Sequence, residues 1–146
     1  MSNKPPCIKD AHIVGTMRVS INWTTGELIE VDLSKQAVAP FDALQDPAFF
    51  NRMQVDEWGA GLDWPGGLDL GADRLYQLCR EQAGLPTPEA FDAWMRRNSL
   101  SLSTAAVSLG MTRRMIAHYR TGSKPIPKVV GLACKGWEVE HGKQPR

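Results

Sequence analysis

A break rich in glycine and proline divides the chain near its middle. Residues 84–88 read Gly-Leu-Pro-Thr-Pro, and they interrupt a helical pattern that proline cannot continue. The charge changes sign at the same place: residues 1–85 carry 7 Lys and Arg against 12 Asp and Glu, whereas residues 86–146 carry 10 against 4. We therefore predict two domains, residues 1–85 and residues 86–146, whose opposite charges nearly cancel to give the chain a total charge of only +1.

The composition of the 146 residues limits the class of protein. Hydrophobic residues make up 42% and charged residues 23%, which excludes a disordered chain, a collagen-like fibre and a uniformly basic nucleic-acid coat. No stretch approaches the roughly 20 apolar residues that cross a bilayer, and the N-terminus leads into no apolar signal core. Three widely spaced cysteines predict no disulfide framework, so we expect a cytoplasmic protein without membrane association.

Alternating apolar residues in the N-terminal half predict strands. Residues 17–23 are apolar at every second position, Gly26 suits a short hairpin loop, and residues 29–33 return with the same alternation. A second short hairpin is predicted within residues 55–64, and a helix over residues 72–83 precedes Gly84 as its stop signal. These elements predict an α+β domain in which helices pack on one side of a small antiparallel sheet.

A short helix is also predicted between the two hairpins. Asp46 is a residue type that caps helix N-termini, and Pro47 suits the first helical position. The buried side of this helix would be supplied by Phe49, Phe50 and Met53. It adds a second helical element to the α+β domain.

Chemistry is sparse in this half. Five carboxylates form an acidic series without the spacing of a calcium loop and without His or Cys among them: Asp56, Glu57, Asp63, Asp69 and Asp73. We interpret them, together with the isolated His12, as solvated residues. We therefore expect no catalytic residue, no metal and no cofactor, and a protein that is not an enzyme.

Several motifs of the N-terminal half occur in a distinctive order. Ile29-Glu30-Val31-Asp32-Leu33 and Phe49-Phe50 precede Leu62-Asp63-Trp64-Pro65, which is followed by Asp69-Leu70 and Leu75-Tyr76. Over roughly residues 10–80 this order resembles a bacterial family known as domain of unknown function 2442. The resemblance implies a small α+β domain and no established activity.

Helix signals follow one another in the C-terminal half. Thr87-Pro88 is predicted to open a helix that buries one stripe of side chains: Phe91, Trp94 and Met95. Ser101 is predicted to cap a second helix that ends at Gly110, and Thr112 a third that ends at about Thr121. Two short helices joined by a glycine turn have the sequence form of a helix-turn-helix.

A fourth helix is predicted after residues 125–127, which read Pro-Ile-Pro. Four residues at helical spacing would face the core: Val130, Ala133, Cys134 and Trp137. The chain from Glu138 onward is polar, and we expect it to fray.

Basic residues gather at the start of the predicted third helix. Arg113 and Arg114 occupy its first turn, where a guanidinium can donate two hydrogen bonds to O6 and N7 of guanine. Ala117 is small enough to approach a thymine methyl, and His118 could donate to a base or a phosphate. Positive charge continues past this turn at positions suited to phosphate contacts: Arg120, Lys124 and Lys128.

The same helices carry a longer motif. Ala105-Ala106 is followed by the run Leu109-Gly110-Met111-Thr112-Arg113-Arg114-Met115-Ile116, and then by Tyr119, Gly122 and Ile126-Pro127. Over roughly residues 88–137 the motif resembles helix-turn-helix domains of the phage-repressor type (Xre/Cro-like, lambda-repressor-like). The resemblance implies a compact helical domain whose third helix enters the major groove.

The resemblance also implies contacts for individual residues. The positions carried over to base edges are Arg113, Arg114, Ala117 and His118. Those carried over to phosphates are Ser101, Ser103, Thr104, Arg120 and Lys124. Leu102 stands where many such repressors have glutamine, so we expect one familiar contact at the start of the second helix to be absent.

The leading hypothesis is a small bacterial transcriptional regulator that binds double-stranded DNA. Because one recognition helix reads only a few base pairs, a homodimer on a palindrome is expected, with the N-terminal domain serving dimerisation or partner contact. The alternative is a protein-interaction module, such as an antitoxin-like adaptor, in which DNA binding is secondary or vestigial. A third interpretation of the C-terminal half is a helical bundle that uses the same caps only to fold.

Overall fold

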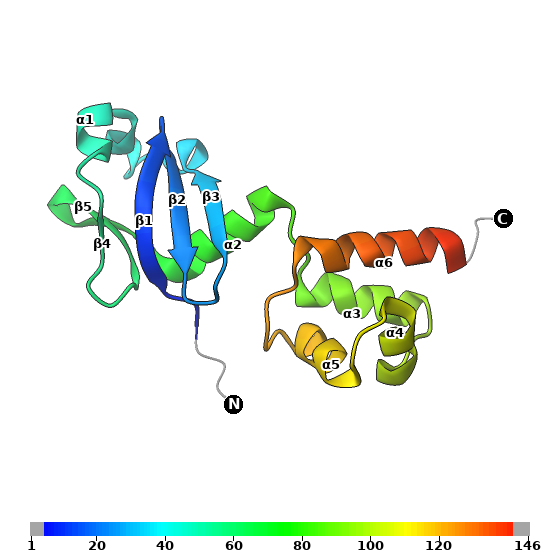
Figure 1. Ribbon diagram of the computed structural model, residues 1–146. Helices are drawn as coiled ribbons and strands as arrows, with labels where there is room; N and C mark the ends of the chain where they lie inside the picture. Colours follow the sequence, from blue (N-terminus) through cyan, green and yellow to red (C-terminus); the bar gives the residue numbers. More distant parts are fainter. Residues whose placement is uncertain (1–4, 142–146) are drawn as a thin grey trace. The chain divides into compact units, whose positions relative to one another are not determined.

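The computed structural model describes residues 5–141 of the chain. The chain divides into two compact units, residues 1–83 and residues 84–146, and each is described by itself. The first is built from strands and helices and the second from helices alone (Figure 1). Within the described residues, no helix is long and apolar enough to cross a membrane.

Two antiparallel sheets of three strands each make up most of the first unit (Figure 1). The first sheet has the order β1 (Ile8–Gly15), β2 (Arg18–Trp23), β3 (Leu28–Asp32). The second has the order β4 (Gln54–Val55), β5 (Gly61–Trp64), β6 (Leu68–Gly71). The expectation of a single sheet was wrong, because β6 follows a Pro-Gly-Gly turn and extends the second hairpin into a sheet of its own.

The alternation in β2 puts one row of side chains into the core. Ile21 pairs with Ile29 across the β2–β3 ladder, and Ile21 and Trp23 are fully buried. Met17 does not join this row, although the sequence pattern placed it in the strand. It lies in the turn between β1 and β2 with a φ of +52°, so its side chain leaves the alternating pattern.

Short helical segments connect the two sheets. They are η1 (Ser34–Gln36), η2 (Asp42–Gln45) and α1 (Pro47–Phe50), and η3 (Pro65–Gly67) joins β5 to β6. As predicted, Asp46 caps α1 by accepting a hydrogen bond from Ala48 N at 3.1 Å. The helix ends at Phe50, before Met53 is reached, and the carbonyl of Phe50 accepts a hydrogen bond from Trp64 Nε1 at 3.0 Å. This bond ties α1 to β5.

Helix α2 (Ala72–Ala83) packs against strands of both sheets. It buries one stripe of side chains: Ala72, Leu75, Leu78 and Cys79. Leu75 is fully buried, and withdrawing a leucine side chain from water stabilises the fold by about 1.5–3 kcal/mol. The predicted boundaries of this helix are confirmed.

Polar side chains of α2 hold the β2–β3 hairpin. The Tyr76 hydroxyl donates to Glu27 Oε1 at 2.5 Å, and Arg80 forms an ion pair with the same carboxylate. Burial, followed by this hydrogen bond to Glu27, raises the pKa of Tyr76 to about 12. Further along, Gln82 pairs with the backbone of Asp32: Asp32 N donates to Gln82 Oε1 and Gln82 Nε2 donates to the Asp32 carbonyl, both at 2.8 Å.

Within residues 84–141, the second unit contains four helices around one core (Figure 1). They are α3 (Pro88–Arg97), α4 (Leu102–Leu109), α5 (Arg113–Thr121) and α6 (Lys128–His141). The predicted stripe of α3 is confirmed, since Phe91, Trp94 and Met95 are all buried. They pack with the other buried residues of the unit: Ala105, Ala106, Ile116, Tyr119, Ile126, Val130 and Cys134.

Two predictions for α6 were wrong. Ala133 is exposed, because the buried stripe of the helix runs through Val130, Cys134 and Trp137 and leaves Ala133 outside it. The chain does not fray at Glu138, since α6 continues to His141. Glu138 is held by residues at the C-terminal end of α3. Arg97 donates to its two carboxylate oxygens at 2.7 and 2.9 Å, and Asn98 donates to one of them at 2.8 Å.

Candidate nucleic-acid interface

A three-residue turn joins α4 to α5. Gly110 ends α4 in the left-handed conformation, with φ +68°, which glycine adopts without the penalty that a Cβ brings. The following Met111 N donates to the Ala106 carbonyl at 2.9 Å. Thr112 then caps α5, its hydroxyl accepting from Met115 N at 3.1 Å. The predicted caps and helix ends on both sides of this turn are confirmed.

One face of α5 is fixed in the core. Ile116 is 0% exposed, and Tyr119 is buried with its ring packed edge-on against Phe91 at a centroid distance of 5.8 Å. Burial raises the pKa of Tyr119, so its hydroxyl stays protonated. This packing sets the orientation of α5 and determines which of its side chains face solvent.

The opposite face of α5 presents its first turn to solvent. Arg113 and Arg114 are exposed, and neither side chain forms a hydrogen bond or ion pair with any residue in 5–141. Ala117 and His118 follow at the i+4 positions and are half-buried. The structure thus brings the four predicted base-contacting residues together on one side of a single helix.

Two other arginines of this unit, Arg96 and Arg120, are already paired. Arg120 Nε donates to Asp92 Oδ1 at 2.7 Å, and Arg96 Nε donates to Asp92 Oδ2 at the same distance. These hydrogen bonds, from Arg96 and then from Arg120, lower the pKa of the Asp92 carboxyl. The Arg120 guanidinium is therefore engaged by α3, and the predicted phosphate contact would have to compete with this bond.

Asp92 is the residue of this region that the sequence analysis missed. Its partner Arg96 lies four residues away on α3, a spacing visible in the sequence. Arg120 lies 28 residues away on α5, and no local pattern relates the two. Asp92 links α3 to the helix that carries the exposed arginines.

The predicted phosphate-contacting hydroxyls surround the start of α4. Ser101 and Thr104 form a reciprocal cap: Thr104 N donates to Ser101 Oγ at 3.1 Å, and Ser101 N donates to Thr104 Oγ1 at 2.7 Å. Both hydroxyls thus serve the helix end. Ser103 is exposed on α4, and Lys124 is exposed in the segment between α5 and α6, without an ion pair in the described part of the chain.

Metal ligands do not cluster in the described residues. No three His, Cys, Asp or Glu side chains within residues 5–141 lie close enough together to hold a metal ion. In the acidic series, Asp56 has a structural role, since its Oδ2 accepts from Trp58 N at 2.9 Å and from Ala60 N at 3.2 Å. This carboxylate shapes the turn between β4 and β5.

Comparison with known proteins relates the chain to a family through its first unit. Residues 8–81 match the model of the family described as protein of unknown function (DUF2442). The chain belongs to this family. The DUF2442 match covers the two sheets and most of α2, and the residues of α3 to α6 follow the matched range.

One solved structure is similar over nearly the whole chain. It is the crystal structure of "Putative DNA Binding Protein NE0471" from Nitrosomonas europaea ATCC 19718. It is 38% identical to this DUF2442 protein, covers 97% of this chain and 94% of its own, and has a TM-score of 0.56. Comparison with curated proteins gave no match.

Proposed function

We propose that this DUF2442 protein binds double-stranded DNA. In this proposal α4 and α5 act as a helix-turn-helix of the phage-repressor type, and α5 enters the major groove. The observation that carries it is the first turn of α5, where two exposed arginines have no partner among the described residues. An unpaired guanidinium retains all its donors for guanine O6 and N7, whereas a paired one must first give up a carboxylate.

The remaining contacts follow from the position of α5. Ala117 and His118 face the same side one turn later, so they would meet the bases next to those read by the arginines. Phosphates flanking the groove would be contacted by a second group of residues: Ser101, Ser103, Thr104 and Lys124. For Arg120 to join them, it would have to leave Asp92, and we therefore assign it a positioning role in the free protein.

Two further features support DNA binding. The similar protein from Nitrosomonas europaea carries a DNA-binding name, and the second half of this chain is basic. We propose a cytoplasmic transcriptional regulator, without catalytic activity, that binds a palindrome as a homodimer, because one recognition helix reads only a few base pairs.

Binding of selected duplexes tests the proposal. The full chain is used to select sites from random duplex DNA, and fluorescence anisotropy then compares Arg114→Ala with Arg96→Ala. Loss of a bidentate base contact is expected to cost about 1–3 kcal/mol for Arg114→Ala. Arg96→Ala, which removes the same charge from α3, is expected to have a much smaller effect. Selection of no sequence, or equal losses in the two variants, would contradict the recognition-helix assignment.

A second candidate function rests on one residue of the first unit. Trp58 is 78% exposed at the tip of the β4–β5 turn, and the Asp56 carboxylate fixes the backbone that presents it. A rigidly presented tryptophan is a common anchor of protein interfaces. In this alternative the first unit binds a protein partner, as in an antitoxin-like adaptor, and a Trp58→Ala variant would lose a stoichiometric partner that the native chain retains in a pull-down.

A further inference from the structure

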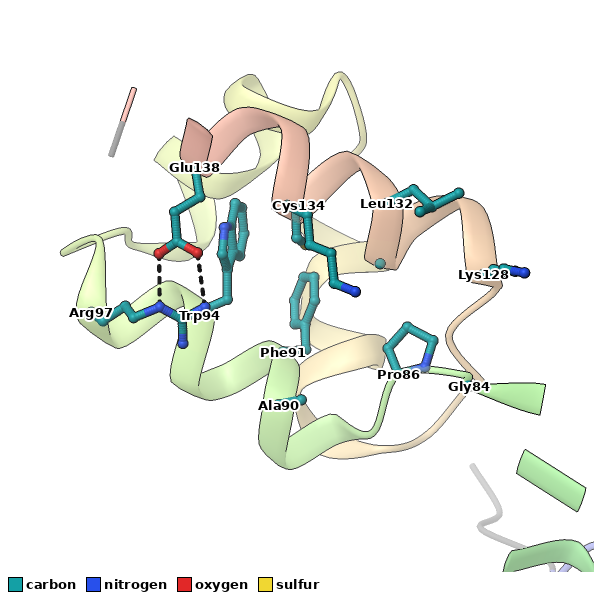
Figure 2. A pocket seen from close by; sticks show the side chains of 12 residues that line it. Gly84, Pro86, Ala90, Phe91, Trp94, Arg97, Lys128, Leu132, Cys134 and Glu138 are labelled. Carbon is teal, nitrogen blue, oxygen red and sulfur yellow. Dashed lines mark hydrogen bonds and ion pairs between the residues drawn. The ribbon is translucent and has the colours of Figure 1, made fainter. Parts of the chain in front are cut away.

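A groove separates α3 from α6 on one side of the second unit. It has a volume of about 240 Å³ and is lined by residues of both helices and of the segment before α3. Figure 2 shows Pro86 at one end, Phe91 and Trp94 rising from α3 toward α6, and the Arg97–Glu138 ion pair at the other end. The volume lies below the range of about 300–1,000 Å³ that is usual for drug-sized ligands, so the groove suits a smaller molecule.

The walls of the groove are largely apolar. Phe91 and Trp94 are buried in the core and reach the groove from α3, and Leu132 borders it from α6 while remaining more than half exposed. Cys134 also lines it, and burial raises the pKa of this thiol to about 11, so it contributes no negative charge at neutral pH. These surroundings favour an apolar ligand body over a fully hydrated one.

The charges around the groove are unbalanced. Lys128 and Lys135 line it, and neither forms an ion pair within residues 5–141. Among the described residues, the acid that lines it is Glu138, whose oxygens already accept from Arg97 and Asn98. The lysines are therefore left without a counter-charge, and the electrostatic complement of the groove is an anion.

A buried donor lies in the same wall. Trp94 Nε1 is buried and has no hydrogen-bond partner among the described residues. Buried donors are paired in the great majority of cases, and those that are not often mark a place where a ligand or water supplies the acceptor. Because this atom has almost no accessible surface, Trp94 contributes an apolar wall to the groove, and its N–H is a nearby reporter of binding.

We propose that the groove binds a small carboxylate with an aromatic or aliphatic body. The body packs against Phe91 and Leu132, and the carboxylate lies in the positive field of Lys128 and Lys135. The competing arrangement is one in which a second copy of the chain covers the groove in place of a small ligand. The exposed arginines of α5 are not among the residues that line the groove, so the proposal stands whether or not the protein binds DNA.

Nuclear magnetic resonance of the full chain tests this site. The indole N–H resonance of Trp94, identified by its absence in Trp94→Phe, is followed during titration with phenylacetate, hexanoate and the uncharged phenylacetamide. Saturable shifts of this resonance are expected with the two acids at millimolar concentration or below, and phenylacetamide is expected to bind at least about tenfold more weakly.

Charge variants locate the carboxylate. Lys128→Gln combined with Lys135→Gln is expected to weaken binding of phenylacetate by about tenfold, which corresponds to about 1.4 kcal/mol. Lys124→Gln, which removes an exposed lysine outside the groove, is the matched control and is expected to bind as the native chain does.

Four results would overturn the proposal. They are the absence of a Trp94 shift with either acid, equal affinity for phenylacetate and phenylacetamide, shifts confined to the other indoles, and no effect of the two lysine substitutions. A concentration-dependent shift of Trp94 without ligand, together with a dimer in light scattering, would assign the groove to a second copy instead. None of these readouts involves DNA, so failure here leaves the DNA-binding proposal to its own test.

Discussion

Lys124 and Arg120 provide a matched pair for testing how the protein meets a phosphate backbone. Both lie near the C-terminal end of α5, and both carry one positive charge. Lys124 is exposed and unpaired in the described residues, whereas Arg120 is bound to Asp92 at 2.7 Å. If only unpaired cations displace counterions from DNA, Lys124→Gln and Arg120→Gln will change the salt dependence of binding differently.

The size of the difference follows from the number of available cations. Each neutralised phosphate contributes about 0.9 to the slope of log K against the logarithm of salt concentration. Lys124 is the unpaired cation that the proposal places at a phosphate, so it is expected to contribute about 0.9 to the slope of each protomer. Lys124→Gln should reduce its magnitude by about 0.9 per protomer. Arg120→Gln should change it little, because the hydrogen bond to Asp92 keeps the Arg120 guanidinium from contacting a phosphate.

The assay is fluorescence anisotropy on a selected duplex, with salt varied between about 50 and 200 mM. Arg120→Gln leaves Asp92 paired with Arg96, so this variant introduces no free carboxylate near the DNA. A loss of slope in Arg120→Gln equal to that in Lys124→Gln would refute the reasoning. It would mean that Arg120 leaves Asp92 on binding and contacts a phosphate itself.

Three further predictions concern stability and reactivity. A Cβ on Gly59, whose φ is +71°, would lie 2.4 Å from the Ile8 carbonyl oxygen, so Gly59→Ala should destabilise by about 2–4 kcal/mol in urea unfolding. Gly66→Ala, at φ +84° with open space around it, should cost only about 1 kcal/mol, and equal costs would exclude the clash. Ile116→Ala should cost about 2–5 kcal/mol in the same assay because it empties a fully buried site under α5, and a cost below 1 kcal/mol would contradict that packing. Burial raises the pKa values of Cys79 and Cys134 to about 11, so iodoacetamide should label both thiols slowly at pH 8 in the folded protein. Labelling, followed by mass spectrometry, should be faster when the protein is unfolded in urea. Equal labelling rates in the folded and unfolded protein would contradict the burial of these thiols.

Local signals predicted the second unit well because its helix ends are decided within a few residues. Thr87, Ser101 and Thr112 each accept a backbone hydrogen bond at the start of a helix, and Gly110 and Gly122 each end one in the left-handed conformation. Such caps depend on the residue type and its immediate neighbours, which the sequence displays directly.

The errors in the second unit have a common physical cause, which is contact between residues distant in the chain. Glu138 belongs to a helix and not to a frayed tail because Arg97, 41 residues earlier, donates two hydrogen bonds to it. Arg120 is paired because Asp92 meets it across 28 residues. Ala133 was predicted to be buried because its helical spacing fits an apolar stripe of α6. The packing of α6 on α3 and α4 decides which side of the helix is covered, and this packing leaves Ala133 exposed.

The amide of Gln82 has a consequence for how the first unit can meet other proteins. It occupies a donor and an acceptor of Asp32, which are the groups that an added strand would use at that end of β3. A peptide that extended the sheet there would first have to expel a side chain making two good hydrogen bonds. Edge-to-edge growth of the sheet is discouraged for the same reason. A partner of this unit is thereby directed to side-chain surfaces such as the Trp58 turn, and away from the backbone of this edge.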